Sequence, residues 1–304
     1  MNSQWEILEQ GIGQFKGGKI SRFKACGIAI MHISAGIVAA TLSYFSFTYN
    51  LVLGVILYFP VIFFIGTRWR AVNNMSHECF HLYFTRERKW NERFGIVLGV
   101  IEFGSYYDFR EEHASHHRYL GDFDADGDFR GFEKFGFSQP VTSGTVWKHL
   151  WFAISLRHLR DYIFVKVYVR RDPLWAKILR TAYFLFLVVF AIFYPLVFLA
   201  YFLVPFASAY QVIKYLTDYL DHGGLLDNAD SLHKSRNCYI NNSILRSIAF
   251  PRHDCYHLVH HLFPAIPNKR MHEAHNWLIE NWPEYGSMEH NFYKKIIRLG
   301  EHRT

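Results

Sequence analysis

Two long stretches without a charged residue constrain the fold of this chain more than any other feature. Residues 25–67 and 181–213 contain no Asp, Glu, Lys or Arg, although the 304-residue chain has 33 Lys and Arg in all. A membrane-spanning helix requires about 20 predominantly apolar residues. The first stretch is therefore long enough for two spans, and we expect a tight turn between them near Tyr49 and Asn50.

The second stretch is shorter and holds two spans only if both helices extend beyond it. We expect these helices to begin near Ile178 and to end near Leu220. Proline restricts the residue before it and interrupts the hydrogen bonding of a helix, so it marks candidate turns. The turn between the two spans is therefore predicted at Tyr194 and Pro195 or at Pro205.

The distribution of Lys and Arg predicts the topology. Four precede Ala25, eighteen lie from Arg68 to Arg180 and ten follow His222, whereas neither predicted hairpin turn carries any. Because cytoplasmic flanks retain Lys and Arg, both hairpins are predicted to enter from, and return to, the cytoplasm. This topology, with attraction to anionic headgroups, also explains the net charge of +7, so we predict no nucleic-acid binding. The first apolar stretch is too long for a signal-peptide core and is interpreted as a retained anchor.

Eighteen histidines are present, and the spacing of eight of them is informative. Residues three or four positions apart lie on one face of a helix, so each of three short clusters is able to aim its imidazoles at one point. We interpret the clusters as partial metal sites and the isolated histidines as ordinary core or surface residues. The three clusters are His77 with His81; His113 with His116 and His117; and His257 with His260 and His261.

A fourth candidate element stands at the end of the last predicted span. His222 is placed there to supply a ninth ligand, and Asp218 lies four residues earlier on the same helical face. Asp218 is either a metal ligand, direct or through water, or a helix-end carboxylate that meets basic neighbours. Glu111 and Glu112 either orient imidazoles of the second cluster as hydrogen-bond acceptors or are simply solvated.

The number and type of candidate ligands favour two iron ions. Structural zinc sites close at four ligands, whereas eight or nine neutral imidazoles suit two metals better than one. Acid and base side chains alone cannot oxidise an unactivated C–H bond, so a metal cofactor must carry such a step. The four cysteines show no paired spacing. Cys79 and Cys255 lie in or beside histidine clusters, and we interpret them as packing residues rather than ligands.

The residues of the first and third clusters resemble those of a known family, the membrane fatty-acid desaturase and hydroxylase superfamily. The first reads HECFH, similar to the H-E-C-G-H of acyl-lipid desaturases, and the third reads HLVHHLFPAIP, similar to their H-x-x-H-H-L-F-P-x-x-P. The YLDH segment at 219–222 resembles the Y-L-Q-H that follows their last span. The resemblance implies that the iron ligands are His77, His81, His113, His116, His117, His257, His260 and His261, with His222 as the ninth.

The same resemblance implies a reaction and its partners. The family uses two iron ions, dioxygen as co-substrate and two electrons from a ferredoxin or cytochrome b5 chain, with water as co-product. This chain has no H-P-G-G haem-binding motif, so we expect a separate electron donor. The expected activity is desaturation of a fatty-acyl or lipid-like chain. The alternative is a hydroxylase or ketolase, or a desaturase of a specialised small metabolite, because Asp221 replaces the Gln of Y-L-Q-H and leaves the substrate open.

One acidic segment matches a calcium-binding pattern. Asp122, Asp124, Asp126, Gly127 and Glu133 stand at the positions of an EF-hand loop. An EF-hand requires a helix on both sides of that loop, and the residues that follow are punctuated by Gly and Pro. We therefore favour a role in supporting the histidine clusters, or contact with a basic partner, over calcium binding.

Two other classes of protein fit this sequence less well than an enzyme does. A metal transporter would need ionisable or polar ligands within its spans, and these spans offer almost none. A metal-binding scaffold would hold metal without consuming oxygen. We therefore predict an all-α integral membrane enzyme whose active site faces the cytoplasm. Its parts are an N-terminal segment 1–24, a hairpin 25–67, a cap 68–180 with two histidine clusters, a hairpin 181–220, and a C-terminal cap 221–304 with the third cluster.

Overall fold

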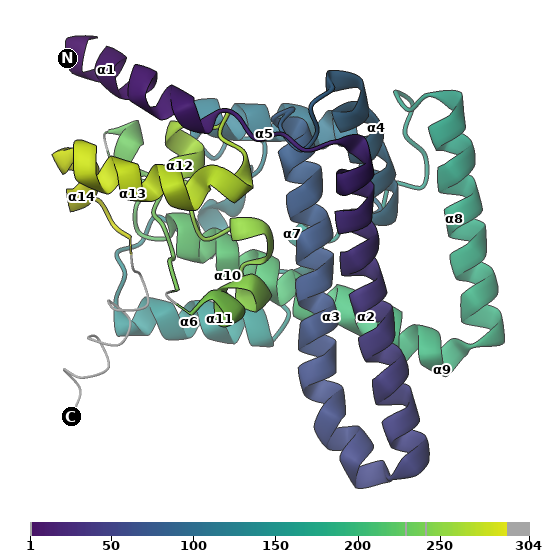
Figure 1. Ribbon diagram of the computed structural model, residues 1–304. Helices are drawn as coiled ribbons and strands as arrows, with labels where there is room; N and C mark the ends of the chain where they lie inside the picture. The colour runs from purple at the N-terminus through teal and green to yellow at the C-terminus, as the bar shows by residue number, and fades with distance from the viewer. Residues whose placement is uncertain (1, 229, 241, 291–304) are drawn as a thin grey trace.

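The fold of this chain, seen in a computed structural model, is built from helices. The structure describes residues 2–228, 230–240 and 242–290. Within these ranges there is no β-sheet, and bridge pairing is limited to isolated residues, such as the bridge between Ile20 and Thr85. Figure 1 shows long helices on one side of the molecule and a group of shorter helices on the other. The described residues thus agree with the predicted all-α class.

The first hairpin turns where the sequence places its turn. α2 (Arg22–Tyr49) and α3 (Leu51–Phe80) pack against each other, with Asn50 between them in an extended conformation at φ −156° and ψ 124°. The Asn50 side-chain oxygen accepts a hydrogen bond from the backbone N–H of Leu53 at 3.0 Å. This N-cap satisfies one of the free donors at the start of α3 and holds the two helices in a tight turn.

α3 continues well past the uncharged stretch. Its 30 residues give a length of roughly 45 Å at 1.5 Å per residue, which exceeds a hydrocarbon core of about 30 Å. The last turns of α3 contain His77, and His81 follows directly as the C-cap residue. The first histidine cluster therefore lies on a direct extension of the second predicted span.

The second hairpin turns at the first of the two predicted positions. α8 ends at Phe193, Tyr194 interrupts the helix, and Pro195 begins the next helical run. Pro205 lies inside that run, between two π-helical segments, and makes no turn. The run ends at His222, two residues beyond the expected Leu220. Its parts are α8 (Leu174–Phe193), α9 (Pro195–Phe198), η3 (Leu199–Leu203), η4 (Phe206–Tyr210) and α10 (Gln211–His222).

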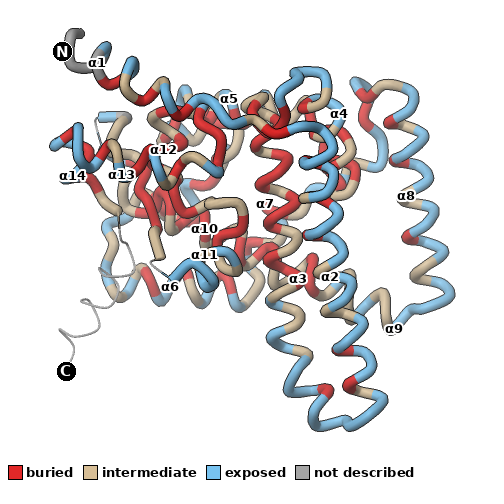
Figure 2. Tube along the Cα trace, viewed as in Figure 1, coloured by how far each residue is buried: buried red, intermediate tan, exposed pale blue. Residues whose placement is uncertain are grey.

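In the part of the chain that the structure describes, four helices are long and apolar enough to cross a membrane: α2, α3, α8 and the run from Pro195 to His222. Their most apolar windows are only 17% or 22% buried, so most of the large apolar side chains on them point outward. Figure 2 shows this exposure along α8 and along the lower parts of α2 and α3. A bilayer is the solvent that suits such surfaces, because exposed apolar patches of this size are rare in soluble proteins.

The other helices form the histidine-bearing region, which comprises the described residues of 81–173 and 223–290. Its buried apolar side chains join α10, α12, α13 and the aromatic segment 129–137 into one cluster. Figure 2 shows buried residues concentrated there. Its helices are α4 (Arg88–Ile101), α5 (Tyr106–Tyr119), η2 (Phe132–Phe135), α6 (Ser143–Ile154), α7 (Leu159–Tyr162), η5 (Ser231–His233), α11 (Ser243–Ala249), η6 (Pro251–His253), α12 (His257–Leu262), η7 (Asn268–Arg270), α13 (Met271–Asn281) and α14 (Pro283–Ser287), while α1 (Asn2–Ile12) and η1 (Gly13–Phe15) precede the first hairpin.

Two ion pairs fasten α3 to the segment that precedes α12. Arg252 donates to both carboxylate oxygens of Glu78, at 2.7 and 2.8 Å. Arg70 donates to Asp254 at 2.7 Å. The side chains of all four residues are at most 16% exposed, so these contacts are little screened by water. They fix the position of α12 relative to the end of α3.

Candidate metal centre

Four helix segments bring the predicted histidines together: the end of α3, the last turns of α5, the end of α10 and the short helix α12. Ser105 is the N-cap residue of α5, and its side chain accepts a hydrogen bond from the backbone N–H of Asp108 at 3.3 Å. This cap sets the register of the helix, so that His113, His116 and His117 fall in its last two turns.

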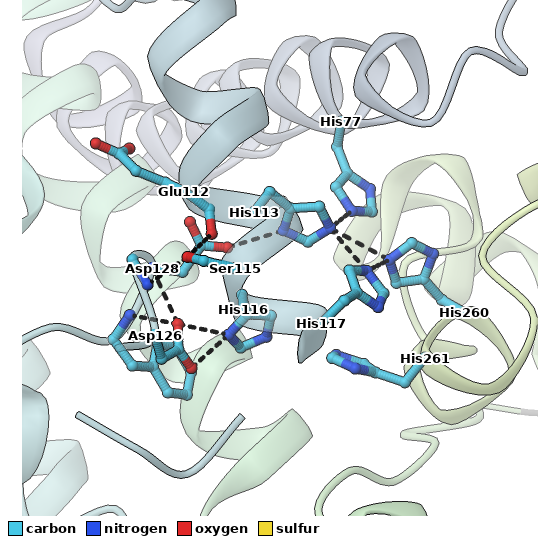
Figure 3. A network of polar contacts seen from close by, with 12 residues as sticks. His77, Glu112, His113, Ser115, His116, His117, Asp126, Asp128, His260 and His261 are labelled. Carbon is cyan, nitrogen blue, oxygen red and sulfur yellow. Dashed lines mark hydrogen bonds and ion pairs between the residues drawn. The ribbon is translucent and has the colours of Figure 1, made fainter. Parts of the chain in front are cut away.

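Five of the histidines gather around one point, and we call them the five-histidine group. One ring nitrogen from each lies within 4.8 Å of every other. Nε2 of His113 is 2.7 Å from Nε2 of His77, 3.0 Å from that of His117 and 3.4 Å from that of His260. Figure 3 shows these rings pointing toward one another. The members are His77, His81, His113, His117 and His260.

The remaining four predicted histidines gather around another point, and we call them the four-histidine group. It contains His116, His222, His257 and His261, again with one ring nitrogen from each within 4.8 Å of the others. Nε2 of His257 is 2.8 Å from Nε2 of His222 and 2.9 Å from Nε2 of His261. The two groups adjoin, because the ring centroids of His117 and His261 are 4.5 Å apart.

Hydrogen bonds at Nδ1 orient several of these rings. His113 donates to Asp128 at 2.8 Å, and His116 donates to Asp126 at 2.9 Å (Figure 3). In the four-histidine group, Nδ1 of His222 donates to the backbone carbonyl of Lys234 at 2.9 Å. A neutral imidazole that donates from Nδ1 carries a lone pair on Nε2. Each Nε2 is therefore directed, as a potential ligand, into the interior of its group.

In this arrangement the lone pairs of several Nε2 atoms face one another. A cation bound between these nitrogens fits such a site. In addition, Nε2 of His81 is buried and has no hydrogen-bond partner among the residues that the structure describes. A buried polar atom without a partner costs free energy unless a ligand satisfies it. Imidazole nitrogens in these numbers suit a transition metal, and two separate groups suit two metal ions. The residues present therefore fit a di-metal centre.

Burial and the charges of neighbouring histidines lower the pKa of most of these imidazoles, which favours their neutral form. Loss of solvation, followed by the charges of neighbouring histidines, holds the pKa values of His257, His260 and His261 well below the ordinary histidine value. Burial also opposes the charged form of His116, but the hydrogen bond and charge of Asp126 outweigh it and raise the pKa of His116. Neutral imidazoles are the form that binds metal.

The structure brings all nine predicted histidines into these two groups and leaves the other candidates outside them. Asp218 belongs to neither group, and its carboxylate accepts a hydrogen bond from the Tyr162 hydroxyl at 2.8 Å. Cys79 and Cys255 are buried in two different apolar clusters, as expected for packing residues. A third set of potential ligands, Asp230, His233 and Glu284, is largely exposed and lies apart from both groups.

The acidic residues that orient the histidines of α5 are not Glu111 and Glu112, the candidates named in the sequence analysis. Glu111 pairs with Arg171 at 2.7 Å, and Figure 3 shows Glu112 directed away from the histidine rings. The acceptors are instead Asp126 and Asp128 in the segment that matches a calcium loop. Their oxygens face imidazoles, which agrees with the cluster-supporting role favoured for this segment.

Two other contacts could not be seen in the sequence. The Lys234 carbonyl orients His222 across twelve residues, and a carboxylate oxygen of Asp221 lies 3.4 Å from Nδ1 of His257. In the sequence, Asp221 is visible only as a departure from Y-L-Q-H and as the neighbour of His222. Its contact with His257 depends on how α10 packs against α12, so the sequence does not predict it.

The comparisons with known proteins agree with this geometry. The sequence profile described as fatty acid desaturase matches residues 53–293, which is most of the chain. A curated relative, the dihydrorhizobitoxine desaturase of Bradyrhizobium elkanii, is 25% identical over 247 residues. That match covers 72% of this chain and 66% of the relative, so it spans just under two thirds of the relative's length. The chain belongs to the fatty acid desaturase family.

Proposed function

We propose that this protein is an oxygen-dependent di-iron desaturase of the membrane. The observation that carries the proposal is the pair of adjoining histidine groups, nine side chains in all, at the ends of helices long enough to cross a bilayer. The ligands in this proposal are His77, His81, His113, His117 and His260 for one iron and His116, His222, His257 and His261 for the other.

The bound irons would supply the oxidation of an unactivated C–H bond by dioxygen. In the balanced reaction, two hydrogens leave adjacent carbons of the substrate and a C=C bond forms. Dioxygen accepts those hydrogens together with two electrons and two protons, giving two molecules of water. The residues of this chain hold the metal-binding nitrogens in place: Asp128 and Asp126 orient His113 and His116, and the Lys234 carbonyl orients His222.

The orientation and partners belong to the same proposal. Lys and Arg flank the ends of the four long helices where the histidines lie and are missing from both hairpin turns, which supports an active site that faces the cytoplasm. The two electrons come from a separate donor of the ferredoxin or cytochrome b5 type. Dioxygen and the membrane complete the set of partners, and nucleic acid is not among them.

Two classes of substrate are proposed. Family membership favours a fatty-acyl or lipid-like chain that enters from the bilayer. The name of the curated relative states desaturation of dihydrorhizobitoxine, which makes a specialised small metabolite the second candidate. Hydroxylation or ketolation at the same irons remains the alternative reaction. It differs only in whether oxygen is transferred to the substrate carbon.

A comparison of host cells tests this function. Cells expressing wild-type protein or His261→Ala at matched levels are profiled by mass spectrometry for lipids and water-soluble metabolites, with a competent electron donor present. We expect a product two hydrogens lighter than its precursor only with the wild type. A product that gains one oxygen instead contradicts desaturation and indicates a hydroxylase.

The matched control is His32→Gln. His32 lies in α2 beside Arg68 and belongs to neither histidine group. This variant is expected to form the product at the wild-type level and to retain the wild-type iron content. Identical profiles for wild type and His261→Ala, with iron bound to the wild type, contradict the proposed function.

A further inference from the structure

One helix of the histidine-bearing region presents an apolar face to its surroundings. α6 carries Trp147, Trp151 and Ile154 at intervals of four and three residues, so these side chains share one face of the helix. They are 65%, 61% and 69% exposed. Contiguous apolar patches are uncommon on protein surfaces that face water. The outward face of α6 therefore indicates a contact with an apolar partner.

The opposite face of α6 packs against α10. Val146, His149 and Ala153 are buried on this face. The His149 ring stacks on the Tyr219 ring with the centroids 3.8 Å apart, and Nδ1 of His149 is 2.7 Å from the Tyr215 hydroxyl. Rotation of α6 to bury its tryptophans would break these contacts. The packing therefore holds the apolar face outward.

The contact with α10 places α6 at the edge of the uncharged spans. Tyr215 comes two residues after Ile213, the last residue of the second uncharged stretch. Figure 1 shows α6 lying across the direction of α2 and α3, below α10 and on the side of the first hairpin turn. Because α6 contacts α10 with its buried face, its apolar face points toward that same side. This is the level at which headgroups would surround the spans.

A second short helix reaches a similar level beside the first hairpin. α11 exposes Ile244 and Leu245, at 69% and 57%, and contacts α3. It leads to Pro251, whose carbonyl accepts a hydrogen bond from the Asn74 side chain at 2.8 Å. Asn74 lies seven residues past Thr67, the last residue of the first uncharged stretch, or about 10 Å along the helix. Figure 1 shows α11 at the same lower edge of the histidine-bearing region as α6.

Basic residues flank the apolar face of α6. Lys148 lies within the helix, Arg157 and Arg160 follow it, and all three are exposed. The segment 143–160 contains no Asp or Glu. Tryptophan favours the headgroup level of a bilayer, and lysine and arginine favour anionic headgroups. An apolar face with tryptophans, edged by basic residues, is typical of helices that lie in the plane of a bilayer surface.

A lipid bilayer is the partner that fits both helices. α6 and α11 are attached to different hairpins, and each lies close to the point where a span leaves its uncharged stretch. Their exposed apolar side chains therefore continue the outward-facing apolar surface of the four long helices. A protein partner would have to bind beside the lipid that covers those helices. The continuity of the two surfaces favours the lipid itself.

We propose that α6 and α11 form a bilayer-resting surface, which consists of Trp147, Trp151 and Ile154 on α6 and Ile244 and Leu245 on α11. These side chains lie at the boundary between headgroups and acyl chains, and anionic headgroups pair with the basic residues beside α6. The inference requires only that the four long helices cross a membrane and does not depend on the proposed reaction. Because α6 packs against α10, this contact also holds the four-histidine group at a fixed height above the acyl chains.

Site-specific fluorescence quenching tests this surface. Single cysteines are introduced as Trp151→Cys, Ile154→Cys and Leu245→Cys in full-length, iron-loaded protein and labelled with a nitrobenzoxadiazole fluorophore. The background is Cys26→Ser, because Cys26 is exposed whereas the other three cysteines are buried. The protein is held as one copy in each nanodisc of phosphatidylcholine and phosphatidylglycerol. We expect each label to lose most of its fluorescence to a lipid with a doxyl group near the headgroup, and little to aqueous iodide.

Two matched positions define the ends of the scale. Ile56→Cys lies on the exposed surface of α3 within the first hairpin, and its label should be quenched by the doxyl lipid. Glu280→Cys is exposed on α13, on the far side of the histidine-bearing region from α6 in Figure 1, and its label should be quenched by iodide alone. Iron content at the wild-type level shows that each variant is folded.

A lipid comparison tests the basic residues. The label at Trp151→Cys should be quenched more strongly by the doxyl lipid in discs that contain phosphatidylglycerol than in discs of phosphatidylcholine alone. Adding Arg157→Gln and Arg160→Gln should remove this difference, because the attraction to anionic headgroups is lost. An unchanged dependence on phosphatidylglycerol in that variant would contradict the role of the two arginines.

Three results would overturn the bilayer-resting surface. Labels on α6 and α11 that are quenched by iodide and not by the doxyl lipid would place both helices in water. Labels shielded from both quenchers, or shielded only in discs that hold two copies, would place them at a protein contact. If the Ile56→Cys label also escaped the doxyl lipid, the long helices themselves would lie outside the bilayer. If Trp151→Cys fails to fold, Ile154→Cys and Leu245→Cys decide in its place.

Discussion

The two histidine groups use the same two helices in opposite ways. In α5, the pair His113 and His117, four residues apart, joins the five-histidine group, and the residue between them, His116, joins the other. In α12, the pair His257 and His261 joins the four-histidine group, and His260 joins the five-histidine group. Adjacent helical residues point about 100° apart, because a helix has 3.6 residues per turn. The spacing H-x-x-H-H is therefore what allows one short helix to serve two metal sites.

Each group also has one hairpin of its own. α3 of the first hairpin contains His77 and is followed directly by His81, and both belong to the five-histidine group. α10, which closes the second hairpin, supplies only His222, in the four-histidine group. The four-histidine group thus has one fewer nitrogen and depends on a single residue from the membrane-capable helices. This difference predicts that removal of one histidine lowers the metal content more in the four-histidine group than in the five-histidine group.

The largest expected effect is on metal content. His222→Ala leaves three nitrogens in its group, whereas His81→Ala leaves four in the other. We expect His222→Ala to lose about one of two irons and all detectable product formation, because binding free energy falls with each ligand removed. His81→Ala should retain more iron. Inductively coupled plasma mass spectrometry of purified protein gives the ratio, and two irons bound to His222→Ala at wild-type affinity would refute the inequality.

The second effect is on stability, through the ion pair that connects α3 to the segment before α12. Glu78→Gln leaves the Arg252 guanidinium with a neutral partner at a largely buried contact. Breaking one side of a buried ion pair costs about 3 to 5 kcal/mol. We expect a correspondingly lower thermal denaturation temperature, and loss of iron from the five-histidine group before the other. Glu111→Gln is the control, because its pair with Arg171 is exposed and should contribute little.

The third effect compares the two orienting aspartates. Asp126 is fully buried, bonds His116 through both oxygens, and accepts from the backbone N–H of residue 128 at 3.0 Å. Asp128, which bonds His113, is 33% exposed. Removing such a partner lowers metal affinity by about 10- to 100-fold. Asp126→Ala should fall near the top of this range and Asp128→Ala near the bottom, as measured by competition with a chelator. The reverse order would show that exposure does not govern these contacts.

The smallest effect concerns calcium. Two acidic side chains of the loop-like segment face His113 and His116, and Asp122 caps the backbone N–H groups of residues 124 and 125. These oxygens are engaged, so millimolar calcium should leave the denaturation temperature of the iron-loaded protein unchanged. A saturable rise in that temperature, abolished by Asp124→Ala, would establish a calcium site.

Local patterns in the sequence predicted much of this architecture. The sequence placed the first turn near Tyr49 and Asn50 and the second at Tyr194 and Pro195 or at Pro205; the structure has its turns at Asn50 and at Tyr194. The helix ends were predicted less well. α8 begins at Leu174, before the expected Ile178, since charge patterning does not show where a helix continues into protein. The individual orienting acids were predicted only in part: Glu111 and Glu112 are not the acceptors, whereas Asp126 and Asp128 lie in the acidic segment for which a supporting role was one of two favoured roles.

The sequence by itself determined that four apolar helices form two hairpins and that nine histidines fall at helical spacings. Both properties are local, because hydrophobic length and the 3.6-residue period need no knowledge of distant segments. Only the tertiary structure decided which histidine joins which group and which acceptor orients each ring. These features depend on how α3, α5, α10 and α12 pack, and the histidine groups join residues as distant in the sequence as His77 and His260.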